Sequence, residues 1–389
     1  MRVAVVGAGA AGLGVAYALT DDVDARNEDA KDENARDDAN ANGVDDTADV
    51  TLFERNDRPG GRMATRRSHG CVYDTGANYV KSDDDRVSRL VREELGAGLA
   101  TVEGDVWTFD AEGTISEGRD DDAPKWTNRD GLARLADRLF HAADATLETG
   151  VYVTKLQRGD GDDGDDGAWY VESREGRRRG PWDAVVLTPP APVTAALLDR
   201  TDWTDDLRRN LRDHVGHVPY RTVTTVALHY PFEVERPYYA LVYDGRSRDG
   251  GNEDGSRVES HDVGWLAREE CKPGHVPEGE SLLVAQMAPD WSADWYDRND
   301  DEVASAAADR VADLLDDHRL AAPDWYDVVR WRDALPNDGA DSDELARAER
   351  ADLWFAGDWV AGEGRVHRAL RSGLDTGDRI RRSLSLGER

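Results

Sequence analysis

The sequence predicts an α/β protein in which a Rossmann-like domain is interrupted by a second domain of mixed α+β structure. Three observations predict this class. A glycine-rich turn, Gly7–Gly12, joins a strand-like run at 3–6 to a helix-like run at 13–19. A long β-rich region follows in the middle of the chain. A final strand at 353–356 and a helix from Val366 then close the sequence, so its two ends are expected to share one domain.

Length and periodicity set the expected domains and elements. The 389 residues are enough for two cores. We expect residues 1–85, 144–200 and 345–389 to form the Rossmann-like domain, and residues 86–143 and 201–344 to form a substrate domain. Apolar residues recur at helical spacing at 86–95, 131–143 and 301–318. Strands are predicted at 50–54, 151–156, 169–173, 184–187, 222–229, 238–243, 264–267, 281–287, 328–331 and 353–356.

The charge of the chain is strongly unbalanced. Asp and Glu number 81 against 49 Lys and Arg, which gives a formal net charge of −32. The acidic residues are spread through periodic segments and accompany 12 tryptophans, so neither an acidic tail nor disorder explains them. We expect adaptation to a halophilic cell, because concentrated salt screens the self-repulsion. The same charge argues against nucleic acid or an anionic membrane as a partner.

The composition also bears on location and metal binding. No apolar run approaches the ~20 residues that span a bilayer. A strand-like run begins near Met1 without a charged leader, which predicts a soluble, cytoplasmic protein. The 2 cysteines, Cys71 and Cys271, are too few for a disulfide framework or a cysteine-rich metal site. We therefore expect no bound metal.

Three polar, low-complexity segments interrupt the periodic pattern, at 21–49, 159–167 and 246–260. They predict exposed insertions, the second of them at the tip of a hairpin. Segment 159–167 is superficially similar to a calcium-binding loop. It lacks the terminal Glu at the required spacing, so it does not predict a calcium site.

The turn Gly7–Gly12 has the spacing of a dinucleotide-binding fingerprint. Gly7 permits the tight turn, Gly9 lets the backbone approach a diphosphate, and Gly12 lets the helix pack on the strand. Glu54 ends the next strand, where its carboxylate can accept hydrogen bonds from a ribose. It lies farther from Gly12 than the usual ~20 residues, because the first polar segment stands between them.

Two further motifs complete a site for an elongated anionic cofactor. The run 58–67 contains two adjacent glycines and four arginines, of which Arg62 can meet a diphosphate. The run 353–359 ends a strand in Gly357 and Asp358, which places a carboxylate where a ribityl chain runs. The helix from Val366 would direct its positive end at a reduced flavin ring.

Together these motifs resemble flavoproteins of the amine oxidase superfamily, and most closely its renalase-like branch. The runs 60–67 and 74–79 are similar to that branch's GGRMATRR and D-x-GAQYF motifs, with Asn78 in place of Gln. The resemblance covers most of the chain. Further matches follow in the expected order, at 186–192, 272–274, 291–292, 331–336 and 357–359.

The resemblance implies a fold of the p-hydroxybenzoate hydroxylase type and a non-covalently bound FAD. Members of the branch oxidise dihydronicotinamide isomers and pass the electrons to oxygen. The residues implied to contact FAD come from the motifs and their neighbours: Gly7, Gly9, Ala10, Ala11, Gly12, Glu54, Arg55, Gly60, Gly61, Arg62, Met63, Gly76, Ala77, Val153, Gly357, Asp358, Arg365, Val366 and Ala369.

The catalytic candidates are residues that could position a substrate, because flavin N5 itself accepts the hydride. They are Tyr79, Asn78, Trp331, Arg332 and His367. A role in the core is an equal alternative for Tyr79, and a structural ion pair is an equal alternative for Arg332. For His367, a place that merely flanks the helix is the favoured alternative.

Two further expectations concern charged side chains. Lys272 lies in a turn-like run, so we expect it at the surface, although amine oxidase relatives use a lysine near N5. Arg66, Arg67, Arg332 and Arg368 belong to motifs expected to converge on the flavin. They would form a cationic island suited to an anionic small-molecule substrate.

Three functions are compatible with these features. The leading one is renalase-like oxidation of a reduced substrate by FAD, with oxygen or another acceptor reoxidising the flavin. The alternative is an amine oxidase or a phytoene-desaturase-like FAD enzyme, although the sequence offers no obvious apolar tunnel or membrane-facing patch for a polyene. A flavin-bearing redox sensor is the third, and no appended regulatory domain supports it.

Overall fold

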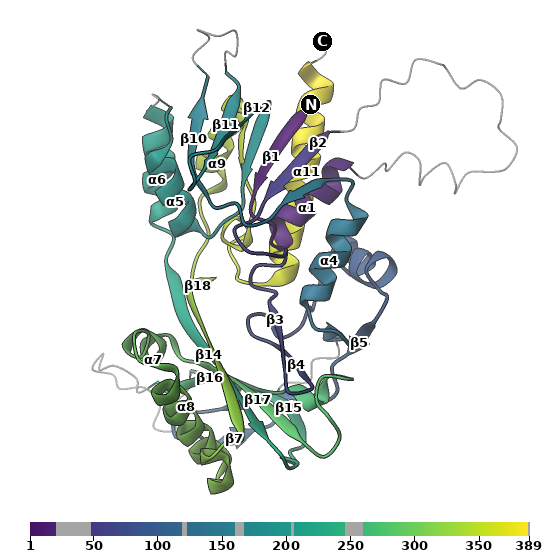
Figure 1. Cartoon of the computed structure of the whole chain (residues 1–389), viewed down its shortest axis with the longest axis vertical. Helices are drawn as coiled ribbons and strands as arrows, with labels where there is room; N and C mark the ends of the chain where they lie inside the picture. The colour runs from purple at the N-terminus through teal and green to yellow at the C-terminus, as the bar shows by residue number, and fades with distance from the viewer. Residues whose placement is uncertain (21–47, 119–122, 160–166, 204–205, 246–259, 388–389) are drawn as a thin grey trace, which may run out of the picture. The chain divides into compact units, whose positions relative to one another are not determined.

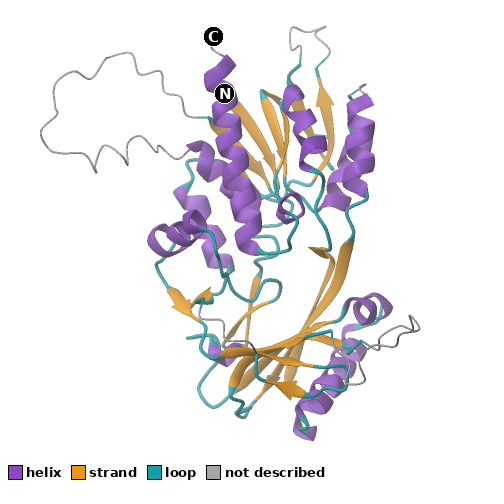
Figure 2. Ribbon diagram, turned by 180° about the vertical axis from the view of Figure 1, so that it is seen from behind, coloured by secondary structure: helices purple, strands orange, loops and turns teal. Residues whose placement is uncertain are grey.

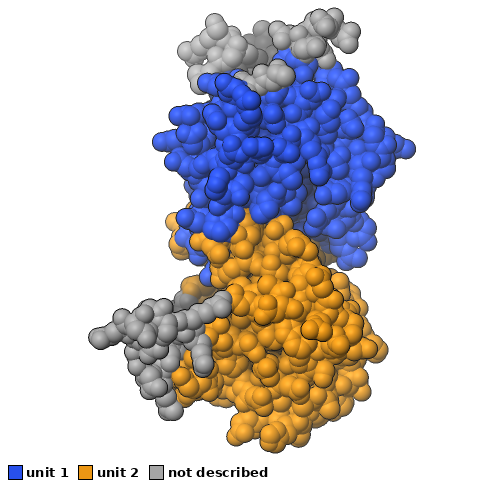
Figure 3. Space-filling model, turned by 90° about the vertical axis from the view of Figure 1, so that its left-hand side faces the viewer, with its two compact units in different colours: residues 1–61, 136–219, 338–389 blue, residues 62–135, 220–337 orange. Residues whose placement is uncertain are grey.

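The computed structural model describes the whole chain except residues 21–47, 119–122, 160–166, 204–205, 246–259 and 388–389. The three expected polar insertions lie almost entirely outside the described residues. The chain forms two compact units (Figure 3). Unit 1 comprises residues 1–61, 136–219 and 338–389, and unit 2 comprises residues 62–135 and 220–337. Residues 62–85, which we expected in the Rossmann-like domain, group with unit 2, and residues 136–143, 201–219 and 338–344, which we expected in the substrate domain, group with unit 1.

Unit 1 is built on a parallel sheet with the strand order β19-β13-β1-β2-β9. Its middle strand is the first strand of the chain, so the strand order reverses direction beside β1, where Rossmann-like folds bind their ligands. The sheet is nearly all apolar because both of its faces are covered. Its strands are β1 (Arg2–Val6), β2 (Asp49–Phe53), β9 (Thr146–Glu148), β13 (Ala184–Leu187) and β19 (Leu353–Phe355).

Helices α1 (Ala10–Thr20) and α11 (Val366–Gly387) lie side by side in unit 1 (Figures 1 and 2). Glycines allow this close contact. A Cβ on Gly373 would lie 2.1 Å from the carbonyl oxygen of Ala11, and one on Gly14 would lie 2.8 Å from that of Leu370. The last helix of the chain therefore packs against the first one. We expected this contact, because the two ends of the sequence were predicted to share one domain.

The other face of the parallel sheet is covered by an antiparallel sheet of β10 (Val153–Arg158), β11 (Trp169–Ser173) and β12 (Arg178–Trp182). Trp182 meets Phe53 edge to face, with ring centroids 5.8 Å apart. The remaining helices of unit 1 are short: α5 (Ala191–Arg200), α6 (Asp206–Gly216), α9 (Ser342–Ala346), the 3₁₀ helix η4 (Arg347–Ala351) and α10 (Asp358–Ala361).

Unit 2 contains a mixed sheet with the strand order β18-β14-β17-β16-β15-β6-β7. Only the β15–β6 pair is parallel. Helix α8 (Asp300–Leu315) packs its apolar side on this sheet and closes the main core of the unit. The strands are β6 (Asp105–Phe109), β7 (Ile115–Ser116), β14 (Tyr220–Tyr230), β15 (Tyr238–Tyr243), β16 (Val263–Arg268), β17 (Ser281–Met287) and β18 (Trp325–Pro336).

Smaller elements complete unit 2. A hairpin of β3 (Thr65–Ser68) and β4 (Cys71–Asp74) stands beside a second small sheet, β5 (Leu99–Thr101) with β8 (Trp126–Asn128). The helical elements are α3 (Asp85–Arg89), the π-helix η1 (Leu90–Glu94), α4 (Ala133–Ala142), the 3₁₀ helices η2 (Glu269–Cys271) and η3 (His318–Ala321), and α7 (Pro289–Asp294). The residues of α4 from 136 onward belong to unit 1.

The structure confirms the predicted class, a Rossmann-like α/β domain with a mixed-sheet domain. The predicted helices are present as α3 with η1, α4 and α8, and every predicted strand is present. The short strands β3 to β9 and β12 were not predicted, because a few residues show no clear period. Among the described helices, none combines the length and apolarity that crossing a membrane demands.

Candidate functional site

In unit 1 the glycine-rich turn follows β1 as the fingerprint requires. Gly7 has φ +99°, and its N–H donates to the carbonyl of Phe53 at 2.8 Å. A Cβ on Gly12 would lie 2.0 Å from the carbonyl oxygen of Gly7, so only glycine allows α1 to start here. A Cβ on Gly9 would meet nothing within 4 Å. The backbone at Gly9 is therefore open to a ligand, beside the first turn of α1, which includes Ala10 and Ala11.

A second glycine pair lies directly against this turn. The Gly60 N–H donates to the carbonyl of Ala8 at 2.8 Å, and Gly9 and Gly60 form a β-bridge. Gly61 has φ +54°, and a Cβ there would lie 3.6 Å from the Cα of Gly9. The two loops together present bare main chain, which fits the close approach of a diphosphate.

Glu54 is buried, with 5% of its surface exposed, and its carboxylate holds the turn. Its Oε2 accepts the Ala8 N–H at 3.0 Å. Its Oε1 accepts the backbone N–H of Asn56 at 2.9 Å and the side-chain amide at 2.7 Å. Arg55, the next residue, is exposed. Glu54 thus has a structural task that the spacing alone did not reveal, and its lone pairs can still accept from a ribose.

The C-terminal motif also lies in unit 1. The Gly357 N–H donates to the hydroxyl of Ser372 at 3.1 Å. Asp358 is 3% exposed and begins α10, where its Oδ1 accepts the Trp359 N–H at 3.1 Å. Arg365 precedes α11, and Val366, His367 and Ala369 occupy its first turn, half-buried. Val153 is buried at the start of β10.

The remaining FAD candidates lie in unit 2, where they extend the β3–β4 hairpin. The Ala77 N–H donates to the carbonyl of Arg62 at 2.9 Å. A Cβ on Gly76 would lie 2.1 Å from that same oxygen, so the position requires glycine. The Arg62 guanidinium donates to the carbonyl of Ala334 at 2.8 Å, and Met63 is buried.

Two side chains fix the backbone that leads to Asn78 and Tyr79. The indole N–H of Trp331 donates to the carbonyl of Thr75 at 2.7 Å. The amide of Gln286 donates to the carbonyl of Gly76 at 2.6 Å. Trp331 therefore anchors the backbone just before Asn78 and Tyr79. Gln286 was missed from the sequence, because nothing in a strand pattern marks a side chain that reaches a distant carbonyl.

Tyr79 belongs to an aromatic cluster with Tyr239 and Trp265. The ring centroids are 6.3 Å apart for Tyr79 and Tyr239, 6.1 Å for Tyr79 and Trp265, and 6.2 Å for Tyr239 and Trp265. Among the described residues, three buried polar atoms here have no hydrogen-bond partner: Oδ1 of Asn78, the hydroxyl of Tyr239 and Nε1 of Trp265. Each such atom is costly to bury unpaired, so each calls for a partner such as an ordered water or a ligand atom.

The structure corrects the expectation for Lys272. Its side chain is 0% exposed and lies 2.9 Å from Oδ2 of Asp74 and 2.8 Å from Oε1 of Glu269. Burial alone would lower the pKa of Lys272, but the two carboxylates raise it well above its ordinary value. The turn was predicted correctly. The surface location was wrong, because one of the partners, Asp74, is very distant in the sequence.

The same buried group includes His275. Its Nδ1 lies 2.8 Å from Oε2 of Glu269, and its Nε2 lies 3.0 Å from the carbonyl of Asn128. Asp74 also accepts from the hydroxyl of Thr65 and the N–H of Leu132, at 2.6 and 2.9 Å. These contacts tie the β3–β4 hairpin to the segment around η2.

The expected cationic island is also corrected. Arg66 pairs with Asp327 at 2.6 Å, Arg67 with Asp130 at 3.3 Å, and Arg368 with Glu363 at 3.2 Å. The exposed guanidinium of Arg332 lies 4.5 Å from the ring centroid of Tyr296. Three of these four arginines therefore have carboxylate partners of their own, so their charge is largely balanced locally.

Comparison with known proteins decides the family. Residues 98–381 match the model of the flavin containing amine oxidoreductases, and residues 5–93 match that of an NAD(P)-binding Rossmann-like domain. The chain belongs to the flavin-containing amine oxidoreductase family. It is therefore a flavin-dependent oxidoreductase, and the family implies FAD as its cofactor. The open backbone at Gly9, beside a helix N-terminus, fits that cofactor.

Solved structures share the fold at low identity. A protein of Exiguobacterium sp. 255-15, provisionally named a protoporphyrinogen oxidase, is 14% identical, with a TM-score of 0.72 over 98% of this chain and 99% of that one. Cyclohexylamine oxidase from Brevibacterium oxydans IH-35A is 16% identical, with a TM-score of 0.66 over 99% of both chains. A fatty acid isomerase from P. acnes is 15% identical, with a TM-score of 0.64 over 97% and 98%.

Proposed function

We propose that this protein is an FAD-dependent oxidase or dehydrogenase of a small amine. The observation that carries the proposal is the aromatic cluster of Tyr79, Tyr239 and Trp265, with its unpartnered polar atoms. Aromatic faces accommodate an apolar amine, and a protonated one by cation–π attraction. The carboxylate partners of Arg66, Arg67 and Arg368 remove most of the reason to favour an anionic substrate.

The chain's own groups would bind and orient the substrate. When bound, FAD supplies the two-electron acceptor. The Tyr239 hydroxyl stays protonated, because burial raises its pKa well above the ordinary value, so it can donate a hydrogen bond to an amine nitrogen. Oδ1 of Asn78 can accept one from an amine N–H. Lys272 is held as an ammonium by two carboxylates, so we assign it a positioning role rather than that of a base.

Renalase-like oxidation of a dihydronicotinamide is the second candidate. It is favoured by the run 60–67 with its GGRMATRR sequence, and by the exposed Arg332, whose guanidinium lies over the ring of Tyr296. An anionic substrate would need that guanidinium. Arg332→Ala should then slow reduction by dihydronicotinamides and leave reduction by amines unchanged.

Anaerobic reduction of the bound flavin separates the candidates. We expect primary amines with an apolar side chain to bleach the flavin faster than dihydronicotinamide isomers do. Tyr239→Phe should weaken amine binding more than tenfold, while Tyr243→Phe, on the same strand but outside the cluster, should not. Rapid bleaching by dihydronicotinamides alone would replace the amine proposal with the renalase-like one.

Further details of the proposal rest on the sequence. We infer that FAD is held non-covalently, since neither Cys71 nor Cys271 falls in the C-terminal flavin motif. In unit 1 the parallel sheet has helices on one face and the three-stranded antiparallel sheet on the other. This layer order supports a fold of the p-hydroxybenzoate hydroxylase type. The net charge of −32 supports a halophilic, cytoplasmic setting, without nucleic acid or membrane as a partner.

A further inference from the structure

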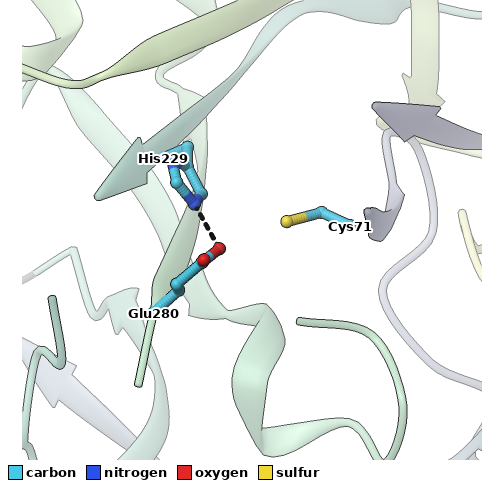
Figure 4. A group of neighbouring side chains, drawn as sticks. All are labelled: Cys71, His229 and Glu280. Atoms are coloured by element: carbon cyan, nitrogen blue, oxygen red, sulfur yellow. Dashed lines mark hydrogen bonds and ion pairs between the residues drawn. The ribbon is translucent and has the colours of Figure 1, made fainter. Parts of the chain in front are cut away.

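A second group of chemically active side chains lies in unit 2, apart from the aromatic cluster. Cys71 begins β4, His229 lies near the end of β14, and Glu280 directly precedes β17. Figure 4 shows the three side chains pointing toward one another. One ligand atom from each lies within 4.8 Å of the other two, and Nε2 of His229 is 2.9 Å from Oε2 of Glu280.

We propose that Cys71, His229 and Glu280 bind one Zn²⁺ ion or a similar divalent transition metal. A thiolate, an imidazole and a carboxylate are the ligands that zinc takes, at ~2.0–2.3 Å from the ion. Ligand atoms around one such ion stand roughly 3–4 Å apart. The three side chains therefore need shifts of only about 1 Å to reach a common ion, and a water would complete the tetrahedron.

The histidine is arranged as zinc ligands usually are. Its ring stacks on Trp325, with centroids 5.0 Å apart and planes 10° from parallel, so its orientation is fixed. Its side chain is 6% exposed. The buried Nδ1 has no hydrogen-bond partner among the described residues, yet Oδ2 of Asp324 lies 3.6 Å away. Metal on Nε2 would place the proton on Nδ1, facing that carboxylate, as in carboxylate–histidine–zinc arrangements.

The charge around Cys71 also favours a cation. The side chain is 1% exposed, and the carboxylates of Glu280 and Glu270 lie close enough to act on it electrostatically. An enclosed thiol beside carboxylates is a poor nucleophile, so a Cys–His catalytic pair is not the better explanation. A divalent ion would displace the thiol proton and balance the carboxylates.

An open hollow of about 260 Å³ lies beside the group, lined by Arg67, Ser68, His69, Gly70, Cys71 and Val72. Because Cys71 is among the lining residues, an ion would approach from the side of the hairpin turn. The metal would join β4 to the adjacent strands β14 and β17, which are paired through His229 and Leu282.

Zinc binding to the full-length flavoprotein tests the proposal. The protein is stripped with a chelator and titrated with Zn²⁺ in excess Mg²⁺, which occupies surface carboxylates but competes poorly for thiolate and imidazole. We expect one tightly held zinc per chain by elemental analysis. Cys71→Ser, His229→Gln and Glu280→Gln should each weaken binding at least tenfold, and Cys271→Ser should not.

Cobalt gives an independent readout. Co²⁺ in this site should show a thiolate-to-metal absorption in the difference spectrum that Cys71→Ser abolishes. Flavin content and melting temperature report whether each variant is folded, and the partly exposed Glu280 is the position least dependent on core packing. Failure of the parent to retain zinc, or equal zinc in the parent and the three variants, would overturn the proposal and leave the FAD-dependent function untouched.

Discussion

The ammonium nitrogen of Lys272 lies 2.9 Å from Oδ2 of Asp74, and both side chains are 0% exposed. Glu269 completes the ion group, with Oε1 2.8 Å from the same nitrogen. Two buried carboxylates thus share the ammonium of Lys272, and one of them, Asp74, ends the strand that leads to Asn78 and Tyr79.

Lys272→Met should destabilise the protein strongly. Removal of one partner from a buried ion group typically costs ~3–5 kcal/mol, because the remaining charges have no compensation. Lys155→Met is a matched control, since Lys155 pairs with Asp202 at 3.5 Å near the surface and should contribute at most about 1 kcal/mol. Denaturant unfolding of both variants gives the comparison, and equal losses would contradict the burial argument.

The pH dependence of that difference follows from the raised pKa of Lys272. A group whose pKa is raised on folding contributes its full stability below its unfolded pKa, here the ordinary value of 10.5. The contribution is lost only as pH rises through the still higher folded value. The stability gap between parent and Lys272→Met should therefore stay constant from neutral pH up to about 10.5 and shrink only above it. A gap that closes between neutral and mildly alkaline pH would show that Lys272 is not held as an ammonium.

Glu54→Gln should weaken FAD binding. A hydrogen bond to a charged group contributes ~1.5–3 kcal/mol, so we expect the dissociation constant to rise roughly ten- to hundredfold. Because Glu54 also accepts the Ala8 N–H, some loss of apoprotein stability should accompany it. Flavin fluorescence on release measures the affinity, and the exposed Asp57→Asn is the control. Unchanged affinity in Glu54→Gln would mean that the adenosine end of FAD lies elsewhere.

The sequence predicted the parts of this protein that depend on local patterns. The turn Gly7–Gly12 and the apolar periods of α4 and α8 follow from backbone and packing rules that act over a few residues. The buried place of Lys272 and the carboxylate partners of Arg66 and Arg67 depend on side chains that meet only in the folded chain. Likewise, Cys71, His229 and Glu280 are too widely spaced to show a metal motif.

The two thiols should react slowly in the native protein. Burial is the largest cause that raises the pKa of Cys71 and of Cys271, each from 9.0 to about 11. A rise of two units lowers the thiolate fraction roughly a hundredfold near neutral pH. Iodoacetamide labelling of metal-free protein should therefore be at least that much slower before unfolding than after it. Rapid labelling of either cysteine in the folded state would contradict the raised pKa values.

Stability should depend on salt. The Debye length grows from ~3 Å at 1 M to ~10 Å at 0.1 M salt, so neighbouring carboxylates repel across many pairs as salt is removed. With a formal net charge of −32, the melting temperature should fall clearly between these two conditions. Calorimetry at both concentrations measures it, and equal melting temperatures would refute the halophilic adaptation.

Identification of the released flavin tests the central claim most directly. Two glycine loops and the C-terminal strand and helix, all within unit 1, are assigned to one elongated cofactor. The purified protein should be yellow and release FAD, one per chain and without a covalent link, when it is denatured in acid and analysed by chromatography. Release of FMN, or a colourless protein that added FAD cannot fill, would contradict the account.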